Sequence, residues 1–247
     1  MEGFGAGQWA VALLAAWLVG ASKTGLSGAV TLAVVLFASI IPAREATGAL
    51  LPVLICADFI AVSMLRKNVQ WPELVRLFPW TAAGVVLGAV LLGFINDQQV
   101  ARLVGAIIVA MMLWQMARKA RGLSNASASA HPAFAPVMGT AAGFTTMVAN
   151  AAGPFVLLYM LAMRMSKLNV VGTTAWYFLV VNLFKVPFAL GLGLITPQSL
   201  AFNLWLVPAV VLGAVAGRWM LNRINQNSFE WMALTLALLG GLRLLLT

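Results

Sequence analysis

The chain has 247 residues, of which 62% are hydrophobic and 9% charged, and its mean hydropathy is +0.98. Soluble domains carry about 25% charged and about 45–50% apolar residues, so the composition excludes a soluble fold and indicates that lipid is the solvent. The net charge of +9 does not indicate nucleic-acid binding, because the basic residues lie in short gaps between apolar runs, where the positive-inside rule expects them.

Two pairs of short apolar runs open the two halves of the chain: 8–20 with 28–41, and 133–148 with 153–165. Each run reaches only ~20–24 Å as a helix, less than a hydrocarbon core of ~30 Å. Glycine, proline and polar residues separate the members of each pair, and irregular backbone survives inside a membrane only where protein or water supplies its partners. We therefore predict two broken or re-entrant helical hairpins, over 8–41 and 133–165.

Six longer apolar runs approach or exceed the ~20 residues that cross a hydrocarbon core. They are predicted to form spanning helices over residues 46–65, 74–95, 99–117, 169–190, 200–221 and 229–246. Trp71, Trp114 and Trp231 lie near their ends, where indole rings settle at the membrane interface. The predicted fold class is an all-α polytopic membrane protein.

The chain contains an internal repeat. The hexapeptide Val-Val-Leu-Gly-Ala-Val occurs at 85–90 and again at 210–215, and at nearly the same offset Asp58 corresponds to Asn182. The repeat divides the chain into an N-terminal half, a small polar linker and a C-terminal half, over residues 1–122, 123–132 and 133–247.

The charge distribution predicts the orientation of the two halves. Four gaps are basic, at about residues 66–76, 118–121, 164–167 and 218–223, and they are assigned to the cytoplasm. The assignment alternates correctly when each hairpin returns to its side of entry. Each half then has three crossings, an odd number, so the second half is inverted. Inverted repeats with discontinuous helices are typical of secondary transporters, whose site lies near the midplane between the repeats.

Lys23 is the strongest candidate for a binding residue. It lies in the first interruption beside Ser22, Thr24 and Ser27, and a charge at the bilayer centre costs at least ~2.5 kcal/mol, so it should face a cavity or a partner. The second half-helix begins near Gly28 and directs its N–H groups to the same place. These features predict a site for a small anion. The alternative is that the lysine snorkels to the interface.

The second interruption offers hydroxyl and amide groups without a charge. Thr145, Thr146 and Asn150 precede a helix N-terminus near Gly153. The repeat predicts that they complete the anion site. The alternative is that small residues at this position only pack the hairpin.

Asp58, Asn182 and Lys185 form a further polar group inside predicted spanning helices. Asn182 and Lys185 are three residues apart and share a helix face. Asp58 is expected to pair with Lys23 or Lys185 or to carry a coupling proton, with a purely structural ion pair as the alternative. Because Lys185 precedes Pro187 near a helix end, snorkelling is the expectation there.

Two G-x-x-x-G pairs, Gly84/Gly88 and Gly213/Gly217, lie on predicted spanning helices and allow close approach of backbones. Packing within the chain is the first interpretation, and a homodimer contact is the alternative. The sequence contains no paired-carboxylate site, no His-Glu metal spacing, no G-x-S-x-G and no Walker A motif. We therefore expect neither enzymatic activity nor a metal or other cofactor.

These features resemble the sulfite exporter TauE/SafE family of bacterial membrane transporters. The resemblance is carried by Gly20-Ala-Ser-Lys-Thr-Gly25, by Gly143-Phe-Thr-Thr-Met and Asn150-Ala-Ala-Gly-Pro154, and by the four-plus-four duplication of segments, and it spans essentially the whole chain. It implies a multi-pass inner-membrane exporter of sulfite, sulfoacetate or a related organosulfonate, with the two interruptions as the matching positions. An anion channel, or uptake of another small oxyanion, is the alternative.

Overall fold

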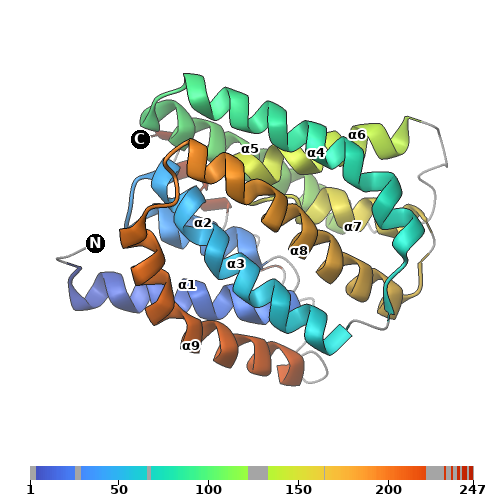
Figure 1. Cartoon of the computed structure of the whole chain (residues 1–247). Helices are drawn as coiled ribbons and strands as arrows, with labels where there is room; N and C mark the ends of the chain where they lie inside the picture. The colour runs from blue at the N-terminus through green and yellow to red at the C-terminus, as the bar shows by residue number, and fades with distance from the viewer. Residues whose placement is uncertain are drawn as a thin grey trace.

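The structure, a computed structural model, describes residues 4–25, 29–65, 68–121, 133–163 and 165–220, with a few positions between 231 and 246. The described part is helical and contains no strand (Figure 1). Its helices are α1 (Ala6–Thr24), α2 (Ala29–Ala38), α3 (Ala43–Leu65), α4 (Trp71–Phe94), α5 (Asp97–Ala120), α6 (Phe134–Ala149), α7 (Gly153–Ala162), α8 (Lys167–Gly191) and α9 (Pro197–Met220).

Five of the six predicted spanning helices are confirmed. The stretches long and apolar enough to cross a membrane are Glu45–Met64, Trp71–Phe94, Asp97–Ala117, Asn169–Gly191 and Pro197–Trp219. The sixth prediction, 229–246, lies largely outside the described residues. The chain is therefore an all-α polytopic membrane protein, as the composition predicts.

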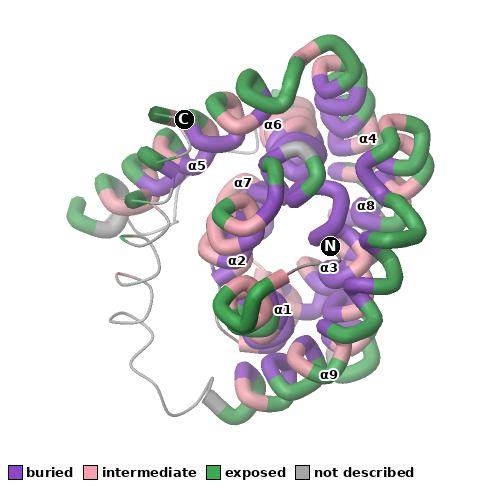
Figure 2. Tube along the Cα trace, turned by 90° about the vertical axis from the view of Figure 1, so that its left-hand side faces the viewer, coloured by how far each residue is buried: buried purple, intermediate pink, exposed green. Residues whose placement is uncertain are grey.

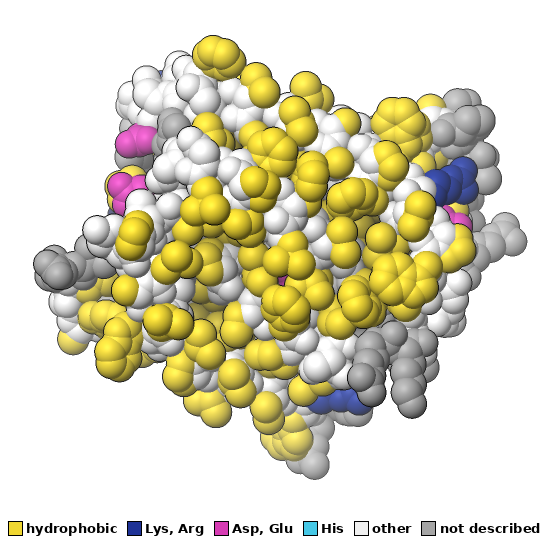
Figure 3. Space-filling model, viewed as in Figure 1, with side chains coloured by type: hydrophobic (Ala, Val, Ile, Leu, Met, Phe, Trp, Pro, Cys, Tyr) yellow, Lys and Arg dark blue, Asp and Glu magenta, His cyan; other side chains and the backbone are white. Residues whose placement is uncertain are grey.

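Apolar side chains cover the outside of this helical bundle. Leu204 and Trp205 on α9 and Phe94 on α4 are among the most exposed large hydrophobic residues. Figure 3 shows such side chains across the middle of one face, with charged side chains at its two edges. This is the distribution expected of a surface that faces acyl chains in the middle and headgroups at the edges.

The first helix interruption is shorter than predicted. The first apolar run was predicted to end at residue 20, but α1 continues to Thr24, because an interior glycine costs a helix only about 1 kcal/mol, whereas unpaired backbone in lipid costs several. The predicted run 133–148 agrees with α6, which spans Phe134–Ala149.

The two helices that follow the interruptions are shorter than the predicted runs 28–41 and 153–165. Helices α2 and α7 have 10 residues each, which corresponds to a rise of about 15 Å, half of a hydrocarbon core. The second interruption is closed by Asn150, whose φ of 50° places it in the left-handed region. Its backbone N–H donates to the last turn of α6, as at many helix C-termini.

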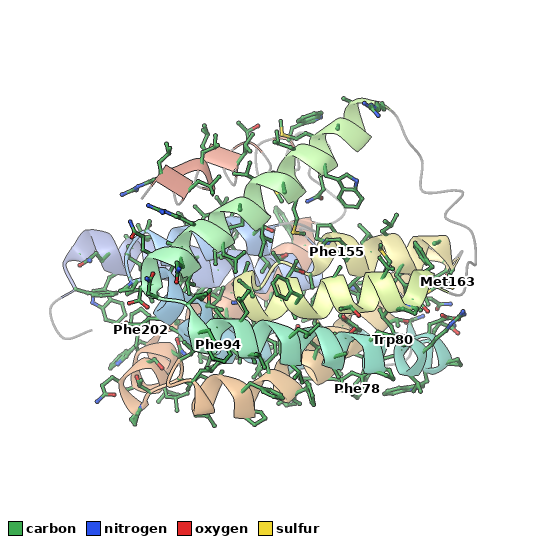
Figure 4. All side chains as sticks on the ribbon, turned by 90° about the horizontal axis from the view of Figure 1, so that it is seen from above. Phe78, Trp80, Phe94, Phe155, Met163 and Phe202 are labelled. Atoms are coloured by element: carbon green, nitrogen blue, oxygen red, sulfur yellow. The ribbon has the colours of Figure 1, made fainter. Side chains whose placement is uncertain are left out.

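Glycines bring helices of the two halves into close contact. A Cβ on Gly20 of α1 would overlap the Val210 carbonyl oxygen of α9, and a Cβ on Gly143 of α6 would overlap the Thr81 carbonyl oxygen of α4. Figure 1 shows α1 beside α9 along one side of the bundle and α4 beside α6 along the other, and Figure 4 shows α4 and α6 adjacent along their lengths. Helices α3 and α8 pack between these pairs.

The G-x-x-x-G pairs take part in the same contacts. Gly84 and Gly88 face α6, while Gly213 and Gly217 face α1. Packing within the chain is thus confirmed for both pairs, and a homodimer stays a prediction. In the repeat, α1 corresponds to α6 and α4 corresponds to α9. The α1–α9 contact and the α6–α4 contact are therefore the same contact with the two halves exchanged. The inversion of one half stays a prediction.

Helix α5 stands further out than the other long helices (Figure 2). It contacts α3 and α6, and its Trp114 ring stacks on Phe155 of α7 with 6.2 Å between centroids. In Figure 4, Phe155 points from α7 toward α5. The candidate site residues described below lie in the inner bundle of α1–α4 and α6–α9.

Candidate functional site

Lys23 forms a buried ion pair with Asp58. Lys23 lies in the last turn of α1 and Asp58 in the C-terminal half of α3, and the Nζ–Oδ1 distance is 2.7 Å. The Asp58 side chain is fully buried, and that of Lys23 is 8% exposed. The expectation that Lys23 faces a partner is confirmed, and the snorkelling alternative is wrong for it.

An aromatic ring contributes to the environment of the same ammonium group. Lys23 Nζ lies 4.0 Å from the centroid of the Phe178 ring on α8. At that distance the negative face of the ring attracts the cation. Lys23 is thus held by one group from α3 and one from α8, which come from different halves of the chain.

Asn182 contacts Asp58, its counterpart in the repeat. The Asn182 Nδ2 on α8 donates a hydrogen bond to Asp58 Oδ2 at 2.7 Å. The two carboxylate oxygens therefore have different partners, an ammonium group on one and an amide on the other. This arrangement fixes the Asn182 amide so that its oxygen points away from Asp58.

Lys185 does not snorkel, so that expectation is wrong. Its side chain is 2% exposed, and its Nζ donates to the Thr146 carbonyl oxygen at 2.8 Å and to Asn150 Oδ1 at 2.6 Å. Asn182 Oδ1 lies 3.4 Å away on the same helix. Because α8 extends to Gly191, Lys185 is more than a turn from the helix end, and it reaches the Thr146 carbonyl oxygen in the last turn of α6, which also accepts the Asn150 backbone N–H.

Asn150 connects the second interruption to α3. Its Nδ2 donates to the Thr47 carbonyl oxygen at 3.1 Å, and Thr47 Oγ1 donates to the Val148 carbonyl oxygen at 3.1 Å. With the Asn150 amide nitrogen engaged in this way, its oxygen must face Lys185. A continuous chain of polar contacts thus leads from the end of α1, through α3 and α8, to the α6–α7 interruption.

We call this group of residues the Lys–Asp–Lys cluster, and it consists of Lys23, Asp58, Thr146, Asn150, Asn182 and Lys185. With two lysines and one carboxylate, its formal charge is +1 among the described residues. Three carbonyl-type oxygens and the Thr146 hydroxyl lie within 3.4 Å of Lys185 Nζ. Lys185 thus contacts neutral acceptors, whereas Lys23 contacts the carboxylate of Asp58.

A model of the family described as "Sulfite exporter TauE/SafE" matches residues 9–244 of the chain. The chain belongs to this family. It is thus a multi-pass membrane transporter of the sulfur-anion type. No curated protein and no solved structure gives a significant match.

Several residues predicted for the site of this TauE/SafE protein lie elsewhere in the structure. Thr24 Oγ1 donates to the Ala214 carbonyl oxygen at 2.8 Å and therefore joins α1 to α9, and Thr145 Oγ1 bonds within its own helix to the Ala141 carbonyl oxygen at 2.7 Å. Gly153 begins α7 as predicted but is exposed. The structure does not bring these three into the Lys–Asp–Lys cluster.

Ser22, Ser27 and Gly28 complete the set of predicted positions. Ser22 is partly buried on α1 next to Lys23, while Ser27 and Gly28 lie outside the described residues. Conversely, sequence reasoning missed Thr47 and Phe178, which contact Asn150 and Lys23. Neither carries a signal in the sequence, since a threonine and a phenylalanine in apolar runs read as packing residues.

The Lys–Asp–Lys cluster is enclosed by protein in this conformation of the transporter. A separate cavity of about 470 Å³ lies between the end of α2, the start of α3 and the start of α5, and Ser39, Asp97 and Arg243 are among its lining residues. None of the cluster residues lines it. The cluster residues other than Lys23 are buried, and this cavity gives no access to them.

Proposed function

We propose that this protein is a secondary transporter that exports a small sulfur-containing anion, sulfite or a short organosulfonate such as sulfoacetate, across the cytoplasmic (inner) membrane. The observation that carries the proposal is the Lys–Asp–Lys cluster itself, in which two lysines and one carboxylate, with a formal charge of +1, lie where helices of both halves meet. Family membership supports the class of substrate.

The energetics of burial favour an anion as the missing component. An ion taken out of water without a counter-charge costs several kcal/mol after relaxation. Lys185 has only neutral acceptors among the described residues, so a bound anion recovers part of this cost. Sulfite and sulfonates present several oxygens on one sulfur atom, and such a group can accept hydrogen bonds from two ammonium groups at once.

The origin of the cluster residues supports alternating access. Lys23 and Asp58 belong to the first half of the chain, while Asn150, Asn182 and Lys185 belong to the second. A movement of one half against the other therefore changes the site itself and can open it to one side at a time. Since the sequence carries no Walker A motif, a gradient of substrate or of a coupling ion would drive the cycle.

The test is the flux of radiolabelled sulfite from proteoliposomes that contain the purified protein. We expect saturable flux in the wild type and its loss in Lys185→Met and Lys23→Met. Arg102→Gln is the matched control, because this exposed arginine of α5 carries the same charge outside the cluster. Absence of flux in the wild type would reject the function, unchanged flux in both lysine variants would reject the site, and flux that rises linearly with substrate would indicate a channel.

A further inference from the structure

The Asn182 side chain lies between Asp58 and Lys185 and contacts both. Its Nδ2 donates to Asp58 Oδ2 at 2.7 Å, and its Oδ1 faces Lys185 Nζ at 3.4 Å. The charges dictate this orientation, because an amide nitrogen must face a carboxylate and an amide oxygen must face an ammonium group. A change in the ionisation of Asp58 therefore changes what Asn182 presents to Lys185.

We propose that Asn182 is a proton-responsive switch: uptake of a proton by Asp58 turns the Asn182 amide over and frees Lys23 and Lys185 for the transported anion. The inference deepens the proposed function and rests on it. It assigns the proton as the ion that moves with the anion and Asp58 as its carrier. Because an inward proton gradient then favours uptake, export is driven by the gradient of the anion itself.

The first step forms one O–H bond. A hydronium ion gives its proton to a carboxylate oxygen of Asp58: one O–H bond of the hydronium ion breaks, one O–H bond to the carboxyl group forms, and a water molecule is left. Lys23 then loses its counter-charge and keeps only the weaker attraction of the Phe178 ring at 4.0 Å. An ammonium group in that state is a binding partner for an incoming anion.

The second step is the rotation of the amide. The new O–H group of Asp58 is a donor and needs an acceptor, which Asn182 supplies when its Oδ1 turns toward the carboxyl group. The same rotation turns the Nδ2 toward Lys185, so that two donors face each other. Lys185 thereby loses one of its acceptors, and an anion oxygen can replace it.

The charge balance explains why a proton should accompany the anion. The empty cluster carries two lysines and one carboxylate, a formal charge of +1. A divalent anion alone would reverse this charge inside a buried site, whereas a divalent anion together with a proton makes the cluster neutral. A monovalent anion together with a proton leaves the charge as it is in the empty cluster. Neither combination of anion and proton therefore gives the buried cluster a net negative charge.

The charged groups on the helices around Asp58 indicate that Asp58 is the proton carrier. Lys23 from α1 and Lys185 from α8 are the charged groups that act on it. Helices α2 and α6 carry no charged residue, and the charged residues of α5 and α9 lie in the first two turns or the last turns of those helices. Among the described residues, Asp58 is thus the carboxyl group placed to exchange a proton with the cluster.

The experiment separates coupling from binding in proteoliposomes with labelled sulfoacetate, whose own charge does not change near neutral pH. Self-exchange is measured with equal sulfoacetate on both sides, and uphill accumulation is measured under an imposed pH gradient. We expect the wild type to perform both. Asp58→Asn, which imitates the protonated carboxyl group, and Asn182→Leu should lose accumulation under the pH gradient, and the self-exchange that remains in Asp58→Asn should not change with pH. Asn203→Leu is the matched control and should retain both, because this buried asparagine of α9 donates to the Ala49 carbonyl oxygen at 2.9 Å, outside the cluster.

The outcomes distinguish the two proposals. If the wild type exchanges neither sulfoacetate nor sulfite, the proposed function fails and the switch fails with it. If the wild type exchanges anion but no pH gradient drives accumulation, or if Asp58→Asn still accumulates it, the switch is overturned and the transport function stands. Should the variants fail to fold, wild-type protein in a weakly buffered detergent solution decides: proton uptake on addition of sulfoacetate supports the switch, and its absence overturns it.

Discussion

Replacement of Asp58 should lower the free energy of unfolding more than replacement of its partner Lys23, although the two belong to one ion pair. Asp58→Leu raises the formal charge of the Lys–Asp–Lys cluster from +1 to +2 and leaves two buried ammonium groups without a carboxylate. Lys23→Met lowers the charge to zero, and Asp58 keeps the hydrogen bond from Asn182 and the nearby charge of Lys185. Leucine has the branched shape of aspartate, and methionine has nearly the length of lysine, so the comparison is made between side chains of related shape.

The magnitudes follow from the geometry of the pair. At 2.7 Å and an effective dielectric constant of about 20, two unit charges attract by about 6 kcal/mol, and desolvation of the two ions offsets most of this. Removal of one partner leaves the desolvation cost uncompensated, which amounts to ~3–5 kcal/mol. We expect Asp58→Leu near the upper end and Lys23→Met near the lower end. The double variant restores a formal charge of +1, so its loss should be at least ~3 kcal/mol smaller than the sum of the two single losses.

Equilibrium unfolding in mixed detergent and SDS micelles, followed by far-UV circular dichroism, gives the four free energies of the double-mutant cycle. Thr24→Val is the control, since it removes a neighbouring hydrogen bond of α1 to the Ala214 carbonyl oxygen and should cost about 1 kcal/mol. Equal losses in Asp58→Leu and Lys23→Met, or strictly additive losses in the double variant, would refute the charge argument.

Three further predictions use the same unfolding measurement. Gly20→Val should cost ~1–3 kcal/mol or more, because its side chain overlaps the backbone of α9, whereas Gly7→Ala, with no atom within 4 Å of the new Cβ, should cost nothing; equal stability of the two would contradict the close α1–α9 contact. Thr81→Val should cost ~1–3 kcal/mol by leaving the buried Tyr177 hydroxyl without its partner at 2.8 Å, and Tyr177→Phe in that background should cost little more. Tyr159→Phe should cost about 1.5 kcal/mol through loss of its 2.7 Å hydrogen bond to a glutamate of α4, and no loss would show that water replaces the bond.

The spanning helices could be predicted because lipid leaves the backbone few choices. A long apolar run inside a membrane must satisfy its hydrogen bonds within itself, so the length of the run gives the length of the helix. The end of α1 could not be predicted in the same way. Gly20 suggested a break by its type, yet it lies inside α1 and allows the backbone of α9 to approach. Whether a glycine ends a helix or packs one depends on a partner that is distant in the sequence.

The candidate site could also be predicted only in part, because several of its contacts join residues that are distant in the sequence. Lys185 was misread because its local pattern, a lysine close to a proline and a helix end, says nothing about rotation of the helix, and its two shortest hydrogen bonds go to residues 39 and 35 positions away. Asp58 and Asn182 are 124 residues apart, and the internal repeat is the one feature of the sequence that relates them. Residues that are equivalent in two related halves can touch each other only near the axis that relates the halves. If the halves are related by such an axis, the carboxyl group and the amide lie where a movement of one half against the other has its centre, and a protonation event there acts on both halves equally.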